Sequence, residues 1–174
     1  INCLKNDIDD IIKNAEVKEL QIALGCNLNE YNEKKLRYGR VVIMADADVD
    51  GYSIMCLVLT FFYKFYPQMI RDGKIFWGKT PLFRVNTKNK LYYAYTDEEL
   101  ETLPKGEVTR LKGLGESEPE DFKDTIFSPN GKYVQFTMED AENATKFFEM
   151  LLGDKIEERR NYIFDNIDFE NLDI

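Results

Sequence analysis

The chain has 174 residues, with 23 Lys and Arg against 32 Asp and Glu, which gives a net charge of −9. It contains no histidine, and this excludes a Ser-His-Asp triad, a Cys-His dyad and any zinc or haem site that needs a histidine ligand. The acidic balance also indicates that the chain alone does not grip a nucleic-acid backbone, so a partner would have to supply the positive surface for any work on DNA.

The first half of the chain predicts helical segments on both sides of one buried strand. Apolar residues recur at helical spacing over residues 7–24, with a break near Asn14, and Gly25 is a natural C-terminal stop. Residues 40–45 (RVVIMA) form a continuous apolar and β-branched run, which is typical of a strand buried on both faces in a parallel sheet. Residues 52–65 are apolar and aromatic and too long for a strand, so they predict a buried helix.

The second half alternates short strands with short helices and ends in helices. The strand–helix–strand order in the middle of the chain indicates an α/β sheet, and the helix-rich tail is expected to form a separate layer. Trp77, within a predicted strand, is expected in the core. Strands are expected at residues 74–77, 82–85, 91–95, 108–111 and 133–136, and helices at 97–103, 119–127, 139–152 and 156–167.

The cysteines and the start of the chain give information on the cellular compartment and on the extent of the chain. Cys3, Cys26 and Cys56 are odd in number and far apart, so they predict reduced thiols in a cytoplasmic protein rather than a disulfide framework or a zinc knuckle. The sequence has no signal-peptide pattern, and its longest apolar stretch is about half a membrane span. Because the first residue is not Met, we expect a piece of a longer chain.

The densest cluster of chemically functional side chains lies directly after the predicted strand at residues 40–45. Asp46, Asp48 and Asp50 place three carboxylates close together in the run DADVDG. In open α/β sheets, ligands bind just beyond the carboxyl ends of the strands. Neighbouring carboxylates repel one another unless a cation binds between them, and an all-oxygen ligand set suits Mg²⁺, Mn²⁺ or Ca²⁺ better than zinc.

Three interpretations of this acidic run compete. An EF-hand needs a bidentate Glu at the twelfth loop position, which is Leu57 here, and a preceding helix where the sequence predicts a strand, so it is rejected. An acidic turn that caps the following helix is a purely structural alternative, with Asp50 as the capping residue. We favour a Mg²⁺ site for phosphoryl transfer, in which metal ions stabilise the attacking and leaving oxygens.

Five segments, spread in order over the chain, carry a family resemblance. RYGRVVIMADADVDG at residues 37–51 closely resembles the TOPRIM metal motif of type IIA DNA topoisomerases, most of all that of the B-type subunits of gyrase and topoisomerase IV. The other segments that resemble this family are LVLTFFY at 57–63, PLF at 81–83, LKGLGE at 111–116, and LGD at 152–154 followed by Arg159 and Arg160. The resemblance covers almost the whole chain.

The resemblance implies a fold and a division of the chain. It implies an α/β TOPRIM fold, Rossmann-like, with a mostly parallel sheet flanked by helices, which lacks its first strand and is followed by a smaller α+β C-terminal region. Residues 1–36 would form a helical lead-in within TOPRIM, residues 37–81 the TOPRIM core with the DxDxD run, and residues 82–174 a C-terminal region of the gyrase B type.

The resemblance also implies a role in DNA cleavage and religation by an ATP-dependent type IIA DNA topoisomerase. Asp46 and Asp48 match the family's catalytic metal ligands, and Asp50 matches the third acid of the set. The implied cofactor is Mg²⁺, for which Mn²⁺ or Ca²⁺ can substitute in binding. The implied partners are the A-type subunit with the nucleophilic tyrosine, the N-terminal ATPase part of the B-type subunit and double-stranded DNA, in the cytoplasm at the nucleoid and without a membrane.

The chain departs from the family in ways that limit this implication. The family's first TOPRIM strand ends in EGDSAGG, whose Glu is a metal ligand, and neither that sequence nor an ATP-binding module occurs here. The chain is therefore expected to have no nucleotide-binding site and to be inactive alone. Ala45, Tyr52, Ser53 and Met55 stand where relatives usually have Thr, a small residue, His and Arg, and Ser117 stands where they usually have Met.

Further residues are predicted to face DNA or the partner subunit. The glycines of KGLGE let backbone N–H groups approach an anion closely, and a tight turn with a solvated lysine is the structural alternative. Scattered bases elsewhere are candidate contacts to the DNA backbone, against the default of ordinary surface charges. The first set is Lys112, Gly113 and Gly115, and the second set is Lys79, Arg84 and Arg110.

Two other functions stay open. A non-catalytic docking module would keep the fold without the chemistry, and the missing Glu and the charge of −9 favour it for the isolated chain. Another TOPRIM enzyme, such as a primase or an OLD-type nuclease, is the second alternative. The KGLGE and GD…RR segments argue against this second alternative.

Overall fold

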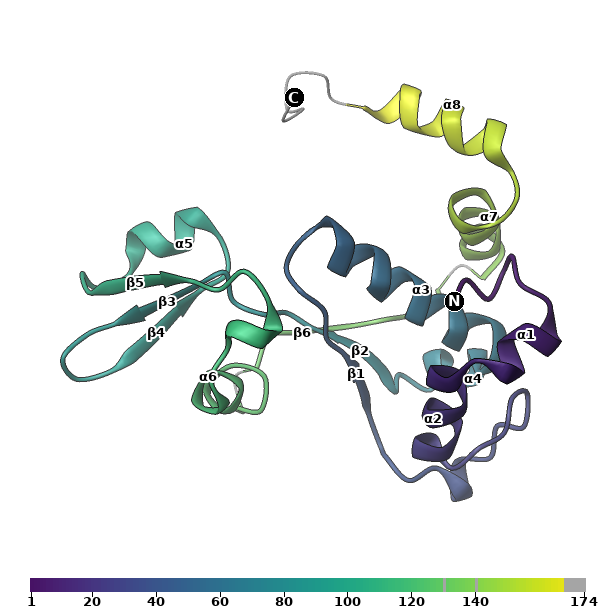
Figure 1. Cartoon of the computed structure of the whole chain (residues 1–174), viewed down its shortest axis with the longest axis horizontal. Coiled ribbons are helices and arrows are strands. Elements are labelled where there is room, and N and C mark those ends of the chain that lie inside the picture. The colour runs from purple at the N-terminus through teal and green to yellow at the C-terminus, as the bar shows by residue number, and fades with distance from the viewer. Residues whose placement is uncertain (130, 140, 168–174) are drawn as a thin grey trace.

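The computed structural model of the chain describes residues 1–129, 131–139 and 141–167 (Figure 1). The helices are α1 (Ile8–Lys13), α2 (Ala15–Leu24), α3 (Val49–Phe65), α4 (Pro67–Arg71), α5 (Asp97–Thr102), α6 (Pro119–Asp124), α7 (Ala141–Leu152) and α8 (Ile156–Asn166). The strands are β1 (Val41–Ile43), β2 (Ile75–Gly78), β3 (Phe83–Asn86), β4 (Leu91–Ala94), β5 (Glu107–Arg110) and β6 (Tyr133–Gln135). The predicted helices and strands are present with slightly different ends, so the α/β class is confirmed; residue 140 of the predicted helix at 139–152 lies outside the described residues.

The predicted helix break near Asn14 is confirmed and has a local cause. Asn14 ends α1, and its side-chain oxygen accepts a hydrogen bond of 3.1 Å from the Val17 amide, which makes it the N-cap of α2. Gly25 ends α2 in the left-handed region at φ 80°, a conformation that glycine adopts without a steric penalty. The two short helices are therefore fixed by their own sequence.

Two three-stranded sheets form in place of one mostly parallel sheet. In the first, β1 pairs with β2 in parallel and β2 pairs with β6 in antiparallel orientation, in the order β1-β2-β6. In the second, β3 pairs antiparallel with both β4 and β5. The expectation of a mostly parallel sheet is therefore wrong for the described residues. The tight turn between β3 and β4 can join only antiparallel strands, and β6 runs into the first sheet from the opposite direction.

The strand β1 is less buried than its apolar sequence predicts. Ile43 is buried, whereas Val41 and Val42 are partly exposed. Among the described residues β1 is the outer strand of its sheet, so solvent reaches its open side. The prediction of burial on both faces is therefore wrong.

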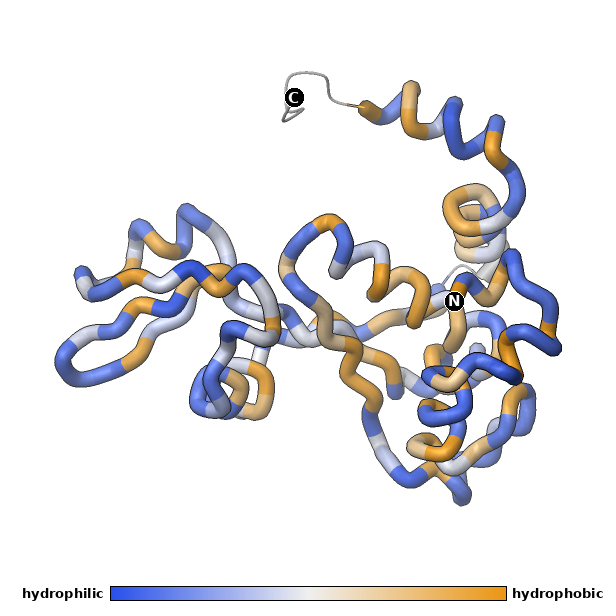
Figure 2. The backbone as a smooth tube through the Cα atoms, in the orientation of Figure 1, coloured by the Kyte–Doolittle hydropathy of each residue, from blue (hydrophilic) through white to orange (hydrophobic). Residues whose placement is uncertain are grey.

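The main core lies where α3 and α4 pack against the first sheet and against α1 and α2 (Figure 2). Phe61, Phe62, Phe65 and Tyr66 are buried there, with contacting ring centroids 5.2 to 6.2 Å apart. Close ring contacts of this kind add to the free energy gained by burying apolar surface. The predicted helix at 52–65 is confirmed, but it is buried only toward its C-terminal end, because Ile54 is 56% exposed. No helix in the described part of the chain is long and apolar enough to cross a membrane.

In Figure 1 the second sheet and α5 lie to the left of the first sheet, α1, α2 and α4 lie to its right, and α3 lies above it. The chain passes from the first sheet to the second between Gly78 and Phe83, and β6 later returns to the first. The division at residues 36 and 81 stays a prediction. Phe148 of α7 stacks on Tyr63 of α3 with ring centroids 4.5 Å apart. The Arg159 guanidinium donates to the carbonyl oxygens of Met150 and Gly153, which satisfies free acceptors at the end of α7.

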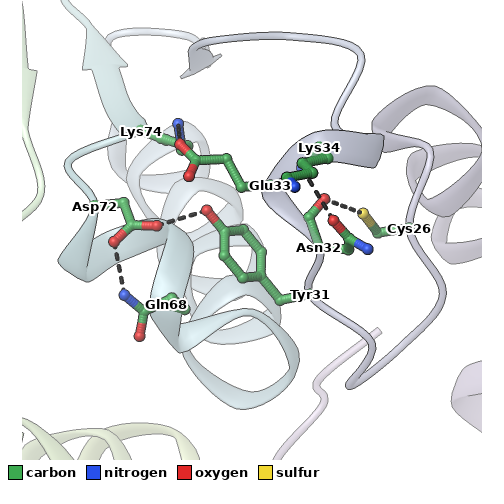
Figure 3. A network of polar contacts seen from close by, with 8 residues as sticks. All are labelled: Cys26, Tyr31, Asn32, Glu33, Lys34, Gln68, Asp72 and Lys74. Atoms are coloured by element: carbon green, nitrogen blue, oxygen red, sulfur yellow. Dashed lines mark hydrogen bonds and ion pairs between the residues drawn. The ribbon is translucent and has the colours of Figure 1, made fainter.

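A polar network ties the segment before β1 to the end of α4 (Figure 3). The Tyr31 hydroxyl donates to Asp72 at 2.5 Å, and the Gln68 amide donates to the other carboxylate oxygen of Asp72 at 2.6 Å. Lys74 and Glu33 form a salt bridge of 3.0 Å beside them. Burial and the hydrogen bond to Asp72 raise the pKa of Tyr31, while the hydrogen bonds from Tyr31 and Gln68 lower the pKa of Asp72.

We expect Tyr31→Phe to destabilise the chain in a pH-dependent way. The lowered pKa of Asp72 gives stability that is present above the ordinary value of 3.8 and is lost as the pH falls. The raised pKa of Tyr31 gives stability that is present below the ordinary value of 10.0 and is lost as the pH rises. Urea unfolding midpoints of wild type and variant should therefore differ most between these values. Tyr38→Phe, at an exposed tyrosine, is the control. A difference in unfolding midpoint between wild type and Tyr31→Phe that is the same at every pH would contradict the assignment.

Candidate functional site

The acidic run forms the turn from β1 into α3. Gly51, in the first turn of α3, lies directly against the backbone of Asp46, because a Cβ added to Gly51 would lie 2.1 Å from the Asp46 carbonyl oxygen. Glycine is therefore the residue that this close approach requires. The turn places Asp46 at the carboxyl end of β1, the location predicted for a ligand site.

Asp48, not Asp50, caps the helix that follows. The carboxylate of Asp48 accepts a hydrogen bond of 2.6 Å from the Gly51 amide, and α3 begins at the next residue, Val49. Asp50 lies exposed in the first turn of α3, where a negative charge favours the helix dipole. The alternative of an acidic turn that caps the next helix is thus correct that a cap exists. It is wrong to name Asp50 as the cap, because a cap must precede the first helical residue.

The glycine loop of residues 111–116 docks on Asp46. The Leu114 amide donates a hydrogen bond of 2.7 Å to a carboxylate oxygen of Asp46. A Cβ added to Gly113 would lie 3.1 Å from the other carboxylate oxygen, so the bare Cα lets the loop approach. The Lys112 amide donates to Glu116 at 3.0 Å and closes the turn. The prediction that Lys112, Gly113 and Gly115 face DNA or the partner subunit stays untested, and within the described residues the Leu114 amide faces the carboxylate of Asp46.

A buried carboxylate ties α6, the helix after the glycine loop, to the second sheet. Asp121 is 1% exposed and accepts hydrogen bonds of 2.8 Å from Arg84 and 2.9 Å from the Tyr93 hydroxyl. A third hydrogen bond, also 2.9 Å, comes from the Glu118 amide at the start of α6. Burial and the hydrogen bond to Asp121 raise the pKa of Tyr93. Arg84, predicted as a DNA contact, thus lies in an ion pair that fixes α6 to the second sheet.

A cleft of about 290 Å³ opens beside Asp46. Lys79 lines it, as does Trp77, which is partly exposed although the sequence predicts it in the core. The reason is that Trp77 lies beside the turn after β1, at the lining of the cleft. Tyr52 of α3 packs edge-on against it, with ring centroids 5.7 Å apart. Sequence reasoning missed Lys132, which also lines the cleft. Lys132 belongs to no sequence motif, and only the folding of the chain brings it to the cleft.

The remaining predicted bases lie near the glycine loop in the sequence. Arg110 is exposed on β5 with its guanidinium 5.8 Å from the centroid of the Phe83 ring. Lys112 is exposed, and Gly115 has open space where a side chain would begin. Gly113 and Gly115 are therefore not equivalent, because only Gly113 is needed for close approach to Asp46. The exposed cations Arg110 and Lys112 are available to a partner.

Asp46 and Asp48 supply carboxylate oxygens, the kind of ligand that Mg²⁺ accepts. Within the described ranges no three His, Cys, Asp or Glu side chains are placed to share one metal ion. Asp46 and Asp48 each commit one oxygen to a backbone amide and keep the other for a ligand. Mg²⁺ commonly takes one or two protein carboxylates and keeps several waters. Whether Asp46 and Asp48 share one ion, and whether Asp50 joins them, stays a prediction.

Comparison with known proteins matches the chain to one family. The family profile described as DNA gyrase B subunit, carboxyl terminus, matches residues 104–164. The DNA gyrase B subunit of Archaeoglobus fulgidus is 40% identical over 181 residues, covering 100% of this chain and 29% of the relative. The gyrase B protein of Clostridium acetobutylicum is 37% identical (100% of this chain, 29% of the relative), and that of Thermotoga maritima is 36% identical (94% and 27%). The chain thus spans less than a third of the length of these relatives.

We expect Gly113→Ala to loosen the glycine loop and Gly115→Ala to leave it unchanged. The added methyl group at Gly113 would crowd the Asp46 carboxylate, whereas the same methyl group at Gly115 meets open space. Losing a hydrogen bond to an ionised acceptor should speed amide hydrogen exchange at Leu114 by about tenfold. Exchange measured residue by residue checks this. Equal exchange rates in the two variants would contradict the docking geometry.

We expect Asp121→Ala to lower the free energy of unfolding by about 3–5 kcal/mol, because it leaves the Arg84 charge largely buried and unpaired. Glu120→Ala removes an exposed acid from the same first turn of α6 and should cost only a few tenths of a kcal/mol. Urea unfolding measures both. A similar small loss in both variants would mean that Asp121 does not anchor α6.

Proposed function

We propose, on the premise that this chain corresponds to a C-terminal segment of the DNA gyrase B subunit family, that it forms the Mg²⁺-binding TOPRIM part of an ATP-dependent type IIA DNA topoisomerase. In this proposal it contributes to DNA cleavage and religation together with the A-type subunit. By itself it is inactive, because the nucleophilic tyrosine, the ATP site and the EGDSAGG glutamate all lie on other segments.

The observation that carries the proposal is the hydrogen bond of 2.7 Å between the Leu114 amide and Asp46. It brings together two segments that are 68 residues apart in the chain, the acidic run and the glycine loop. Each of these segments resembles a topoisomerase motif independently of the other. Their meeting at the carboxyl end of a parallel strand is what a shared site requires.

The chain's own residues take distinct parts in this proposal. Asp46 and Asp48 would hold Mg²⁺, and Asp50 adds a negative charge beside them. When bound, the metal neutralises charge on the oxygens of a phosphodiester. Lys79, which lines the cleft beside Asp46, and the loop residue Lys112 would contact the DNA backbone.

The proposed partners follow from what the chain lacks. A net charge of −9 opposes binding to DNA, so the A-type subunit must bring the positive surface. The ATPase part of the B-type subunit supplies nucleotide hydrolysis. Since the relatives above are gyrase B subunits, a topoisomerase is favoured over other TOPRIM enzymes such as primases and OLD-type nucleases.

A non-catalytic docking module is the second candidate. It is favoured by the absence of a three-acid metal group in the described residues and by the use of Asp48 as a helix cap. Such a module would bind the A-type subunit equally well in Mg²⁺ and in EDTA, and would not restore cleavage to a complex assembled from the missing parts.

Asparagine substitutions separate catalysis from folding at this site. Asp46→Asn keeps an oxygen for the Leu114 amide, and Asp48→Asn keeps a good helix cap, so both variants should fold normally. In a complex reconstituted with the A-type subunit and the rest of the B-type subunit, each should reduce Mg²⁺-dependent DNA cleavage at least about a hundredfold.

The control for these variants is Glu101→Gln, which removes an exposed acid in α5 and should cleave like the wild type. Thermal unfolding of each variant verifies that the fold is intact. Normal cleavage by Asp46→Asn and Asp48→Asn would rule out the proposed metal site.

A further inference from the structure

The strand β4 has an open edge, because it pairs with β3 on one side only in the order β4-β3-β5 (Figure 1). At the turn that joins β3 to β4, the Thr87 amide donates to the Lys90 carbonyl oxygen at 3.1 Å, so these two residues form a hydrogen-bonded pair. In an antiparallel ladder such pairs alternate with pairs whose backbone groups point away from each other. Tyr92 is therefore the next residue that bonds to β3, and the backbone N–H and C=O groups of Leu91 and Tyr93 point outward from the sheet.

The pairing of β3 with β5 agrees with this alternation. The Leu111 amide donates to the Leu82 carbonyl oxygen at 2.8 Å, so every second residue of β3 from Leu82 onward bonds to β5. The residues of β3 between them, Phe83 and Val85, are left for β4. The backbone groups of β3 are thus used on both sides, and those of β4 on one side.

One end of the open edge is closed by a side chain. The Tyr95 amide, next in the outward-pointing series, donates to a carboxylate oxygen of Glu99 at 2.8 Å. Within the described ranges no other segment bonds to the amides of Leu91 and Tyr93. These two residues therefore form a short unpaired edge of defined length.

A cavity of about 420 Å³ runs along this edge, and we call it the β4 groove. It is lined by Leu91 and Tyr93 and also by Tyr92, and successive side chains of a strand point to opposite faces of the sheet. A cavity that touches both sets must follow the edge between the two faces. Thr125 and Ser128, from the segment that follows α6, line the opposite wall.

The side chains of the β4 groove define the segment that fits it. Lys90 lies exposed at one end, with its ammonium 5.3 Å from the centroid of the Tyr92 ring, and it is in no ion pair within the described part of the chain. Lys132, also in the lining, is neutralised by Glu99 at 2.7 Å. The exposed acid Asp124 lies in the lining with the hydroxyl side chains and suits a hydrogen-bond donor.

We propose that the β4 groove binds an extended peptide segment of another protein, which adds to the second sheet as a strand antiparallel to β4. Its backbone bonds to Leu91 and Tyr93, its apolar side chains lie on the tyrosine rings, and its hydroxyl side chains face the wall with Asp124. An acidic residue at its C-terminal end lies beside Lys90. In strand addition of this kind the backbone supplies the affinity and the side chains the specificity. The inference goes beyond the proposed function and does not depend on the proposed metal site.

Amide hydrogen exchange on the whole chain tests the strand addition. The probe is a capped peptide of five alternating threonine and valine residues followed by glutamate. At saturation, exchange at Leu91 and Tyr93 should slow about fivefold, as expected for one neutral hydrogen bond at each amide. Exchange at Tyr92 and Ala94 should change little, because their amides already bond to β3. These two residues are the internal control.

A charge substitution tests the position of the acidic end. Lys90→Gln should weaken binding of the glutamate peptide about two- to fivefold, as for the loss of one exposed ion pair. Lys88→Gln makes the same change two residues earlier, in the exposed turn outside the groove, and should leave the binding unchanged. A peptide that ends in glutamine should bind equally to the wild type and to Lys90→Gln.

Four results would overturn the inference. The first is unchanged exchange at Leu91 and Tyr93 with several millimolar peptide, and the second is equal slowing at all four amides of β4. The third is full binding of a peptide whose inner amides are N-methylated, since such a peptide cannot extend a sheet. The fourth is slower exchange at Leu91 and Tyr93 as the protein concentration rises without peptide, which would assign the edge to a second copy of this chain.

Discussion

The hydrogen bond from the Leu114 amide to Asp46 joins the parts of the chain on which any chemistry at this site depends. It links the turn after β1, in the first sheet, to the loop that leads from β5 of the second sheet into α6. A hydrogen bond to an ionised acceptor is roughly twice as strong as a neutral one. The bond between the Lys79 amide and the Lys132 carbonyl, at 2.9 Å, extends the antiparallel pairing of β2 and β6 in the first sheet beside the cleft. The cleft, which Asp46 lines, therefore lies beside the contact that joins the two sheets.

The carboxylates that would bind metal also stabilise the fold. Asp48 caps α3 with one oxygen, and Asp46 gives one oxygen to the glycine loop. A cation bound at these acids would therefore bear on the position of the loop through Asp46, and on the start of α3 through Asp48. This double role explains why alanine is a poor probe here and asparagine is an informative one. Alanine removes the cap and the loop contact together with the charge, whereas asparagine removes only the charge.

Local sequence signals were sufficient to predict the helices and strands. Contacts between residues far apart in the chain determined how the strands pair and which side chains are exposed. Asn14 and Gly25 fix their helix ends through neighbouring residues, so the sequence could place them. The pairing of Arg84 with Asp121 joins residues 37 positions apart, and the exposure of Trp77 depends on how the turn after β1 packs. The antiparallel pairing of β6 is likewise a property of the whole chain. For the candidate site, the motifs pointed to Asp46 and the glycine loop separately and gave no hint that one docks on the other.

The net charge of the whole chain differs from the local charge of the cleft. Acids in the first turns of α1 and α8 contribute to the overall charge of −9, and these helices do not line the cleft. At the cleft, Lys79 and Lys132 face Asp46 and Glu99, so the local charge is balanced. A divalent cation at Asp46 would make the cleft positive without any change elsewhere. Because attraction between exposed charges fades beyond about 10 Å at ordinary salt, the charges that line the cleft act on a charged ligand there more strongly than the distant acids do.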